Sequence, residues 1–194
     1  LLFTLFKEKQ QGHRPAVERG HGTEWFSGLL GSAPAKPSAI IVSPDDPALL
    51  QYTGGTTGVA KAAVLTHRNL VANTIQTGAW MVAHALDSVE GEYGKAEVFL
   101  GAIPFFHVYG MTVVMNLCIS QGHTMVLLPQ FKVQEVLETI VKYRPTFFPG
   151  VPTMYTAINN YPKVGRYNLR SIKACLSGAA PLPVEVASRF EALT

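Results

Sequence analysis

The stretch that decides the fold is HTMVLLPQFKVQEVLETIVKYRPTFFPG, residues 123–150. Its two ends, 123–129 and 145–150, are short apolar runs bounded by proline or glycine, which indicates buried strands. Between them, apolar residues recur at the i, i+3, i+4, i+7 and i+8 spacing of one helix face. A helix between two buried strands predicts neighbouring strands of a parallel sheet that the helix covers. The residues of that helix face are Val133, Val136, Leu137, Ile140 and Val141.

The same alternation of strands and helices continues on both sides of this stretch. Upstream, 48–53 and 62–66 are short apolar runs that predict strands. Thr66 suits the N-cap of a helix from His67, with Val71, Ile75, Gly78 and Val82 on one face. Further strands are expected at 98–104 and 172–178, and further helices at 109–119, at 151–160 and from Pro183, a residue suited to a first turn. The fold class predicted is therefore α/β, with a mainly parallel sheet covered by helices.

Composition narrows the class of protein. Of the 194 residues, 47% are hydrophobic and 15% are charged, which is typical of a folded domain with a substantial core. The net charge of +3 comes from dispersed side chains, so no basic run predicts a nucleic-acid partner. Apolar runs fall far short of the roughly 20 residues of a membrane span. Cys118 and Cys175 both lie in apolar runs, which predicts buried free thiols in a reducing cytoplasm.

Residues 1–45 are weakly patterned and contain the Pro- and Ser-rich connector GSAPAKPS, residues 31–38. We expect an N-terminal lead-in and connector over 1–45, and part of an α/β domain over 46–194. The chain has no initiator Met and stops in what reads as mid-helix. It is therefore expected to be a piece of a longer protein.

The loop between the first two predicted strands is TGGTTGVAK, residues 53–61. Its glycines allow backbone N–H groups to approach an anion, and its threonine hydroxyls and lysine ammonium are phosphate donors. The loop fits neither the Walker A pattern, because Ala62 follows Lys61, nor the G-x-G-x-x-G dinucleotide pattern. The residues favour phosphate binding, with an ordinary glycine-rich hairpin loop as the alternative.

YTGGTTGVAK, followed by LTHRNL, closely resembles the signature loop of the adenylate-forming enzymes. This superfamily includes acyl- and aryl-CoA synthetases, luciferases and the adenylation domains of peptide synthetases. Together with PFFHVYG, residues 104–110, the loop is most similar to that of bacterial long-chain fatty acid–CoA ligases. The resemblance covers roughly residues 45–190, and it implies that 46–194 form part of an ATP- and acyl-binding α/β domain. It implies that the parent protein activates a fatty acid with ATP, releases pyrophosphate and transfers the acyl group to coenzyme A, with Mg²⁺ bound through ATP.

The resemblance implies three groups of site residues. In the loop, Thr56, Thr57 and Lys61 are the candidate catalytic residues, and they contact the nucleotide together with Thr53, Gly54, Gly55 and Gly58. The turn after the predicted strand 172–178 forms a wall of the adenine and acyl pockets through Ser177, Gly178, Ala179, Ala180 and Pro181. The third group lines the acyl pocket and consists of Phe105, Phe106, His107, Tyr109 and Gly110.

Without the resemblance, the last two groups have simpler explanations. A histidine among aromatic residues is commonly a packed residue, and SGAAPLP, residues 177–183, is an adequate tight connection between a strand and a helix. With the resemblance, His107 becomes a pocket or gating residue. It is not expected to act as a general base, because a substrate carboxylate is already ionised at neutral pH.

Several features of the family lie beyond Thr194, among them a Tyr-Gly-x-Thr-Glu stretch and a C-terminal domain with a lysine needed for adenylation. The chain alone is therefore expected to be inactive. Alternatives are an aryl-CoA ligase, a peptide-synthetase adenylation domain, or a non-catalytic nucleotide-binding fragment. The histidines and aspartates show no ligand spacing, so no protein metal site is expected. A cytoplasmic location is expected, with peripheral contact at the inner membrane face as an accompaniment of a long-chain substrate.

Overall fold

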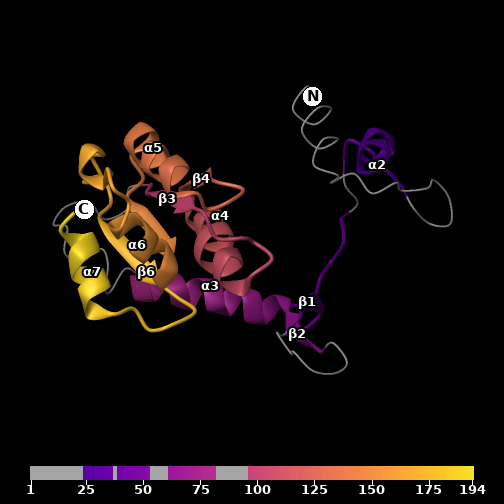
Figure 1. Ribbon diagram of the computed structural model, residues 1–194. Coiled ribbons are helices and arrows are strands. Elements are labelled where there is room, and N and C mark those ends of the chain that lie inside the picture. The colour runs from indigo at the N-terminus through magenta and orange to yellow at the C-terminus, as the bar shows by residue number, and fades with distance from the viewer. Residues whose placement is uncertain (1–23, 37–38, 53–60, 82–95) are drawn as a thin grey trace. The chain divides into compact units, whose positions relative to one another are not determined.

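The computed structural model describes residues 24–36, 39–52, 61–81 and 96–194 (Figure 1). The chain divides into two compact units, Leu1–Ile41 and Val42–Thr194. In the first unit, the short helix α2 (Phe26–Ser32) has no buried residue. The second unit contains the sheet and the helices that carry the predicted site.

The four strands of the main sheet are β3 (Val98–Gly101), β4 (Thr124–Leu127), β5 (Phe147–Gly150) and β6 (Ala174–Ser177). All pair in parallel, in the order β4-β3-β5-β6. The prediction of a mainly parallel sheet is therefore confirmed. Phe99 lies beside Phe147 in the register, and Phe148 lies beside Cys175.

Side-chain alternation along the strands gives the sheet two apolar faces, because successive residues of a strand point to opposite sides. On one face, Leu100 and Phe148 pack with α5 (Val133–Tyr143), α6 (Pro152–Asn159) and α7 (Val184–Glu191). On the other face, Phe99 and Phe147 stack on each other and belong to a second cluster. Helices α3 (His67–Met81) and α4 (Leu117–Gln121) contribute Met81, Leu117 and Cys118 to that cluster.

Helix α5 follows the predicted period closely. Val136, Leu137 and Ile140 are fully buried, whereas Val141 at the edge of the face is half exposed. The helix ends at Arg144, which adopts a left-handed backbone with φ 48° and donates its N–H to the Ile140 carbonyl at 2.9 Å. This bond satisfies one of the carbonyls left unpaired at a helix C-terminus.

The first two predicted strands form a separate antiparallel pair, β1 (Pro47–Tyr52) and β2 (Ala62–Thr66). The strands themselves were predicted, but they form a hairpin of their own and do not join the parallel sheet. The loop that joins them, 53–60, lies outside the described residues. Six of the predicted nucleotide-binding residues therefore lie outside them as well: Thr53, Gly54, Gly55, Thr56, Thr57 and Gly58.

The start of α3 confirms the predicted N-cap. Thr66 Oγ1 accepts the N–H of Asn69 at 3.2 Å, and Asn69 Oδ1 accepts the N–H of Thr66 at 3.0 Å, so the two residues cap each other reciprocally. The connector before β1 is joined to the same turn, because Arg68 donates to both carboxylate oxygens of Asp45 at 2.8 and 3.0 Å.

The predicted buried face of α3 is wrong for Val71 and Ile75 and is confirmed for Gly78, whereas Val82 lies outside the described residues. Val71 and Ile75 are 58% and 66% exposed, and the buried residues are Thr74, Gly78 and Met81. Gly78 lies close to α4, because a Cβ added at Gly78 would lie 2.4 Å from Gln121 Nε2 of that helix. The contact with α4 therefore selects the face with the smallest side chain.

The helical stretch predicted at 109–119 contains a π-helix, η2 (Gly110–Asn116), followed by α4. A π-helix of this length is rare and is frequently found at functional sites. Gly110 allows the close approach of the preceding segment, since a Cβ at this position would lie 2.5 Å from the Pro104 carbonyl oxygen. A glycine is therefore required where the segment turns into the helix.

Both cysteines are free thiols. Cys118 is fully buried, and burial raises its thiol pKa to about 12. The prediction of burial is wrong for Cys175, which is exposed on β6 and lines a pocket there. None of the helices in the described ranges is long and apolar enough to cross a lipid bilayer.

We expect the free energy of unfolding to decrease as the pH is lowered through about 6.5, because of His123. Its Nδ1 accepts the N–H of Glu97 at 3.3 Å, and its ring stacks on Phe99. Burial lowers the His123 pKa, and the Glu97 charge opposes this effect only in part. The unfolded chain therefore binds more protons as the pH falls through 6.5, so the free energy of unfolding decreases.

Urea unfolding at pH 7.5 and pH 5.5 measures this effect. His123→Asn is the test variant, because its amide oxygen can accept the same N–H and does not titrate. The variant should lose part of the pH dependence of the wild-type protein. An unchanged pH dependence would assign the effect to other groups.

Candidate functional site

The carboxyl ends of β3, β5 and β6 lie at the same edge of the parallel sheet, where ligands bind in open α/β sheets. The chain leaves β3 into Pro104–Gly110 and leaves β6 into the turn Ser177–Pro181. Two of the three predicted groups of site residues therefore meet at this edge. We call this edge the strand-end site.

Tyr109 joins the two groups directly. Its hydroxyl donates to the carbonyl oxygen of Leu176, which is the last but one residue of β6. Its ring packs against Gly178, where a Cβ would lie only 2.9 Å from Tyr109 Cε1. The segment that follows β3 is therefore in contact with the turn that follows β6.

A second tyrosine, Tyr155 of α6, reaches the same carbonyl from within the core. Its hydroxyl lies 2.8 Å from the Phe148 carbonyl oxygen and 3.2 Å from the Leu176 carbonyl oxygen, and it donates to both. Burial raises the pKa of both Tyr109 and Tyr155 far above the usual range, so both hydroxyls remain protonated donors. The Leu176 carbonyl thus accepts from two tyrosines.

The turn after β6 is held in an uncommon conformation. Ala179 has φ 69°, a left-handed backbone that costs a non-glycine residue about 1–2 kcal/mol. Gly178 donates its N–H to the Gly150 carbonyl oxygen at 3.0 Å, which ties the turn to the end of β5. Ser177 Oγ is buried and has no hydrogen-bond partner among the described residues.

The His107 side chain is exposed to solvent and is hydrogen-bonded to the backbone two residues further along the chain. Its Nδ1 accepts the N–H of Tyr109 at 3.2 Å. In the neutral imidazole the proton therefore lies on Nε2, which can donate to an anion. Phe106 is 84% exposed and Phe105 is half-buried, so these two predicted acyl-pocket residues do not form a closed pocket in this structure.

Lys61 is exposed directly before β2. It follows the loop whose other predicted phosphate donors are not described, so the structure does not test the loop as a phosphate site. No group of three His, Cys, Asp or Glu side chains in the described ranges is placed to hold a metal ion.

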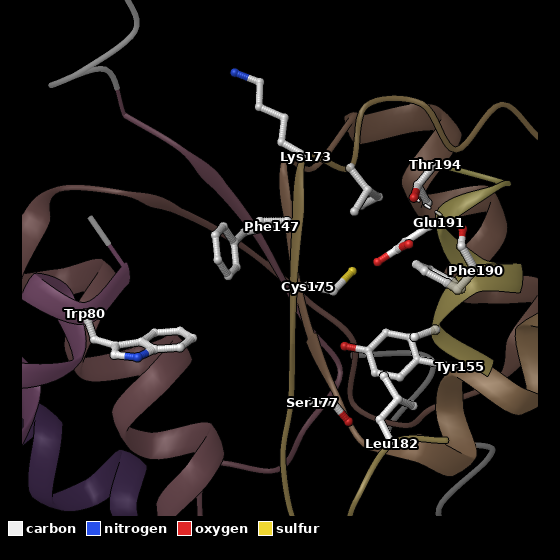
Figure 2. Close-up of a pocket in the computed structure, with 13 residues that line it drawn as sticks. Trp80, Phe147, Tyr155, Lys173, Cys175, Ser177, Leu182, Phe190, Glu191 and Thr194 are labelled. Atoms are coloured by element: carbon white, nitrogen blue, oxygen red, sulfur yellow. Dashed lines mark hydrogen bonds between the residues drawn. The ribbon is translucent and has the colours of Figure 1, made fainter. Parts of the chain in front are cut away.

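A pocket of about 340 Å³ lies along β6 (Figure 2). Figure 2 shows Trp80 and Phe147 on one side of the sheet and Cys175 and Phe190 on the other. Of the predicted site residues, Ser177 is among those that line this pocket. On the Cys175 side, the pocket is lined by Ala187, Phe190 and Glu191 of α7 and by Leu182, which precedes the helix.

The sequence did not single out Tyr155, and it assigned Tyr109 only to the acyl pocket. A tyrosine on the buried face of a short apolar helix was the available signal for Tyr155, because its hydroxyl needs a partner when it is buried. Which partner it finds depends on the register of β5 and β6, which the sequence does not encode locally.

Comparison with known proteins gives matches along most of the chain. A family model described as AMP-binding enzyme matches residues 5–194. The long-chain-fatty-acid–CoA ligase of Bacillus subtilis (strain 168) is 52% identical over 149 residues, which cover 77% of this chain and 25% of that protein. The probable 4-coumarate–CoA ligase 1 of Dictyostelium discoideum is 37% identical over 142 residues, covering 73% of this chain and 24% of that protein.

The structure is also similar to solved structures. The crystal structure of ATP-bound MatB from Rhodopseudomonas palustris matches with a TM-score of 0.71 and 28% sequence identity, over 87% of this chain and 31% of that one. The chain spans about a quarter of the length of the curated relatives that it matches.

Proposed function

Because the chain belongs to the adenylate-forming family of AMP-binding enzymes, we propose that its parent protein is a long-chain fatty acid–CoA ligase. The proposed reaction joins the fatty acid carboxylate to AMP, with release of pyrophosphate, and then transfers the acyl group to the thiol of coenzyme A, with release of AMP. The proposal concerns the parent protein, since the chain spans a quarter of its relatives.

The observation that carries the choice of substrate is the level of identity. The chain is 52% identical to the long-chain-fatty-acid–CoA ligase of B. subtilis and 37% identical to the probable 4-coumarate–CoA ligase of D. discoideum. The second match supports an aryl-CoA ligase as the alternative function within the same family.

The chemistry proposed for the first step needs no proton transfer. The ionised carboxylate attacks the α-phosphorus of ATP, and negative charge develops on the departing pyrophosphate. We assign stabilisation of this charge to the backbone and hydroxyl donors of 53–58 and to the ammonium of Lys61, which act best when they are positioned in advance. Mg²⁺ would reach the site with the phosphate oxygens of ATP.

The strand-end site is proposed to bind the adenine of ATP and the acyl group. The turn Ser177–Pro181 is assigned to the wall of the adenine and acyl pockets. His107 is assigned to the carboxylate end of the acyl group, since the N–H at Nε2 is a suitable donor to an anion. The parent protein is proposed to act in the cytoplasm, with peripheral contact with a membrane that supplies its substrate.

The proposal is tested with the parent protein, ATP and a panel of acetate, octanoate, palmitate and 4-coumarate. We expect pyrophosphate release with palmitate to exceed that with acetate by more than about 100-fold in kcat/KM, because each buried methylene contributes about 0.8 kcal/mol. Faster release with 4-coumarate would still support an adenylate-forming ligase, but its substrate would be an aromatic acid. No release with any acid, from a protein shown to be folded, would contradict the ligase function.

A further inference from the structure

The turn Ser177–Pro181 is held by contacts from outside its own segment. Its backbone is strained at Ala179, and left-handed alanine persists only where the surroundings determine it. The surroundings here are the Gly178–Gly150 hydrogen bond and the two tyrosine hydroxyls on the Leu176 carbonyl. Each of these contacts fixes the point at which the chain leaves β6.

The two tyrosines differ in what they connect. Tyr155 is 1% exposed, and its shorter hydrogen bond goes to the Phe148 carbonyl, so it belongs to the core beneath the sheet. Tyr109 is half-buried, and its hydroxyl donates to the Leu176 carbonyl oxygen of β6. It also lies two residues from His107, whose Nδ1 accepts its backbone N–H. Tyr109 therefore connects the His107 segment to the turn, whereas Tyr155 connects the turn to the core.

We propose that Tyr109 is a positioning residue that couples the acyl-binding segment Pro104–Gly110 to the nucleotide-binding turn Ser177–Pro181. Its hydroxyl acts on the turn through the Leu176 carbonyl, and its ring fills the space that Gly178 leaves open. This inference rests on the proposed function for the roles of the two segments. The positioning itself rests only on the contacts, and it differs from the direct substrate contact predicted for Tyr109 from the sequence.

The physical consequence is a link between the two substrates. A shift of Tyr109 on acyl binding changes the hydrogen bond to Leu176 and hence the position of the turn. Loss of the hydroxyl removes one neutral hydrogen bond, and this corresponds to roughly a 2- to 10-fold change in an equilibrium constant. The effect should appear at the turn that follows Leu176, which lies 67 residues along the chain from Tyr109, and not at the acyl segment alone.

The test uses Tyr109→Phe in the parent protein, because phenylalanine keeps the ring against Gly178 and removes only the hydroxyl. Hydrogen exchange of the peptide 176–182 is the first readout, and it needs no catalytic activity. We expect exchange in the variant to be roughly 2- to 10-fold faster. The apparent KM for ATP, expected to rise by a similar factor while the KM for palmitate stays constant, is the second readout.

Two further variants separate positioning from general damage. Tyr143→Phe, on the exposed surface of α5, is the matched control and should change neither readout. Tyr155→Phe should lower the melting temperature more than Tyr109→Phe does, because it leaves the buried Phe148 carbonyl without that donor. Unchanged exchange at 176–182 in Tyr109→Phe would overturn the inference, and a rise in the KM for palmitate alone would return Tyr109 to the acyl pocket.

Failure of the proposed function gives a different result. If the wild-type parent releases no pyrophosphate with any acid, the ligase function fails, and the assignment of the two segments to nucleotide and acyl group fails with it. The hydrogen-exchange comparison would still decide whether Tyr109 positions the turn.

Discussion

Replacement of Lys61 by alanine is expected to lower the kcat of pyrophosphate release by the parent protein by about 100- to 1000-fold. Removal of one positioned donor to a developing anion typically costs this much. Lys61 is exposed directly before β2, and in the sequence it closes the threonine- and glycine-rich loop. The expected loss is larger in kcat than in the affinity for ATP, because charge builds on the pyrophosphate only as its bond to the α-phosphorus breaks.

The measurement is single-turnover pyrophosphate release with saturating ATP and palmitate. Lys163→Ala is the matched control, since Lys163 is an exposed lysine in the connection between α6 and β6. It removes the same charge away from the loop and should retain nearly full activity. A loss of less than about threefold in Lys61→Ala would contradict the assigned role of this residue.

Replacement of Phe148 by alanine is expected to lower the free energy of unfolding by about 3–5 kcal/mol. Phe148 is fully buried on β5, and its ring packs edge-on against Tyr155, with the ring centroids 5.5 Å apart. It also lies 6.2 Å from the ring of Phe190 on α7. The substitution therefore leaves a cavity at the point where α6 and α7 meet the sheet.

Urea unfolding followed by far-UV circular dichroism checks this prediction. Phe106→Ala is the matched control, because it deletes the same atoms from a side chain that is 84% exposed. The control should change the free energy of unfolding by less than about 0.5 kcal/mol. Similar losses in the two variants would show that Phe148 does not hold the helices on the sheet.

The elements that the sequence predicted well are those whose signal is local. Helix α5 has a full set of apolar residues at helical spacing, and the strands around it are short apolar runs with clear ends. The parallel pairing followed because a helix separates each pair of successive strands. The signature loop indicated the family for a similar reason, since its residue types and spacing lie within one short stretch.

The features that the sequence did not predict depend on distant neighbours. The buried face of α3 is set by η2 and α4, so the more apolar Val71 and Ile75 remain exposed. Cys175 lies among apolar residues in the sequence, but it is exposed at a pocket along β6. The Tyr109 hydrogen bond joins residues 67 positions apart, and no periodicity reports such a contact.

The strand order β4-β3-β5-β6 has a consequence for the synthesis of the chain. The central strand β3 can pair with β4 once Leu127 has been made, but its other edge waits for β5, and β6 follows only at Ser177. At about 5–20 residues per second, the ribosome needs roughly 1–5 s to pass from Leu127 to Gly150, the end of β5. During that interval the nascent chain carries an open strand edge flanked by Phe99 and Leu100, which is a surface that chaperones bind and that promotes aggregation when it is left uncovered.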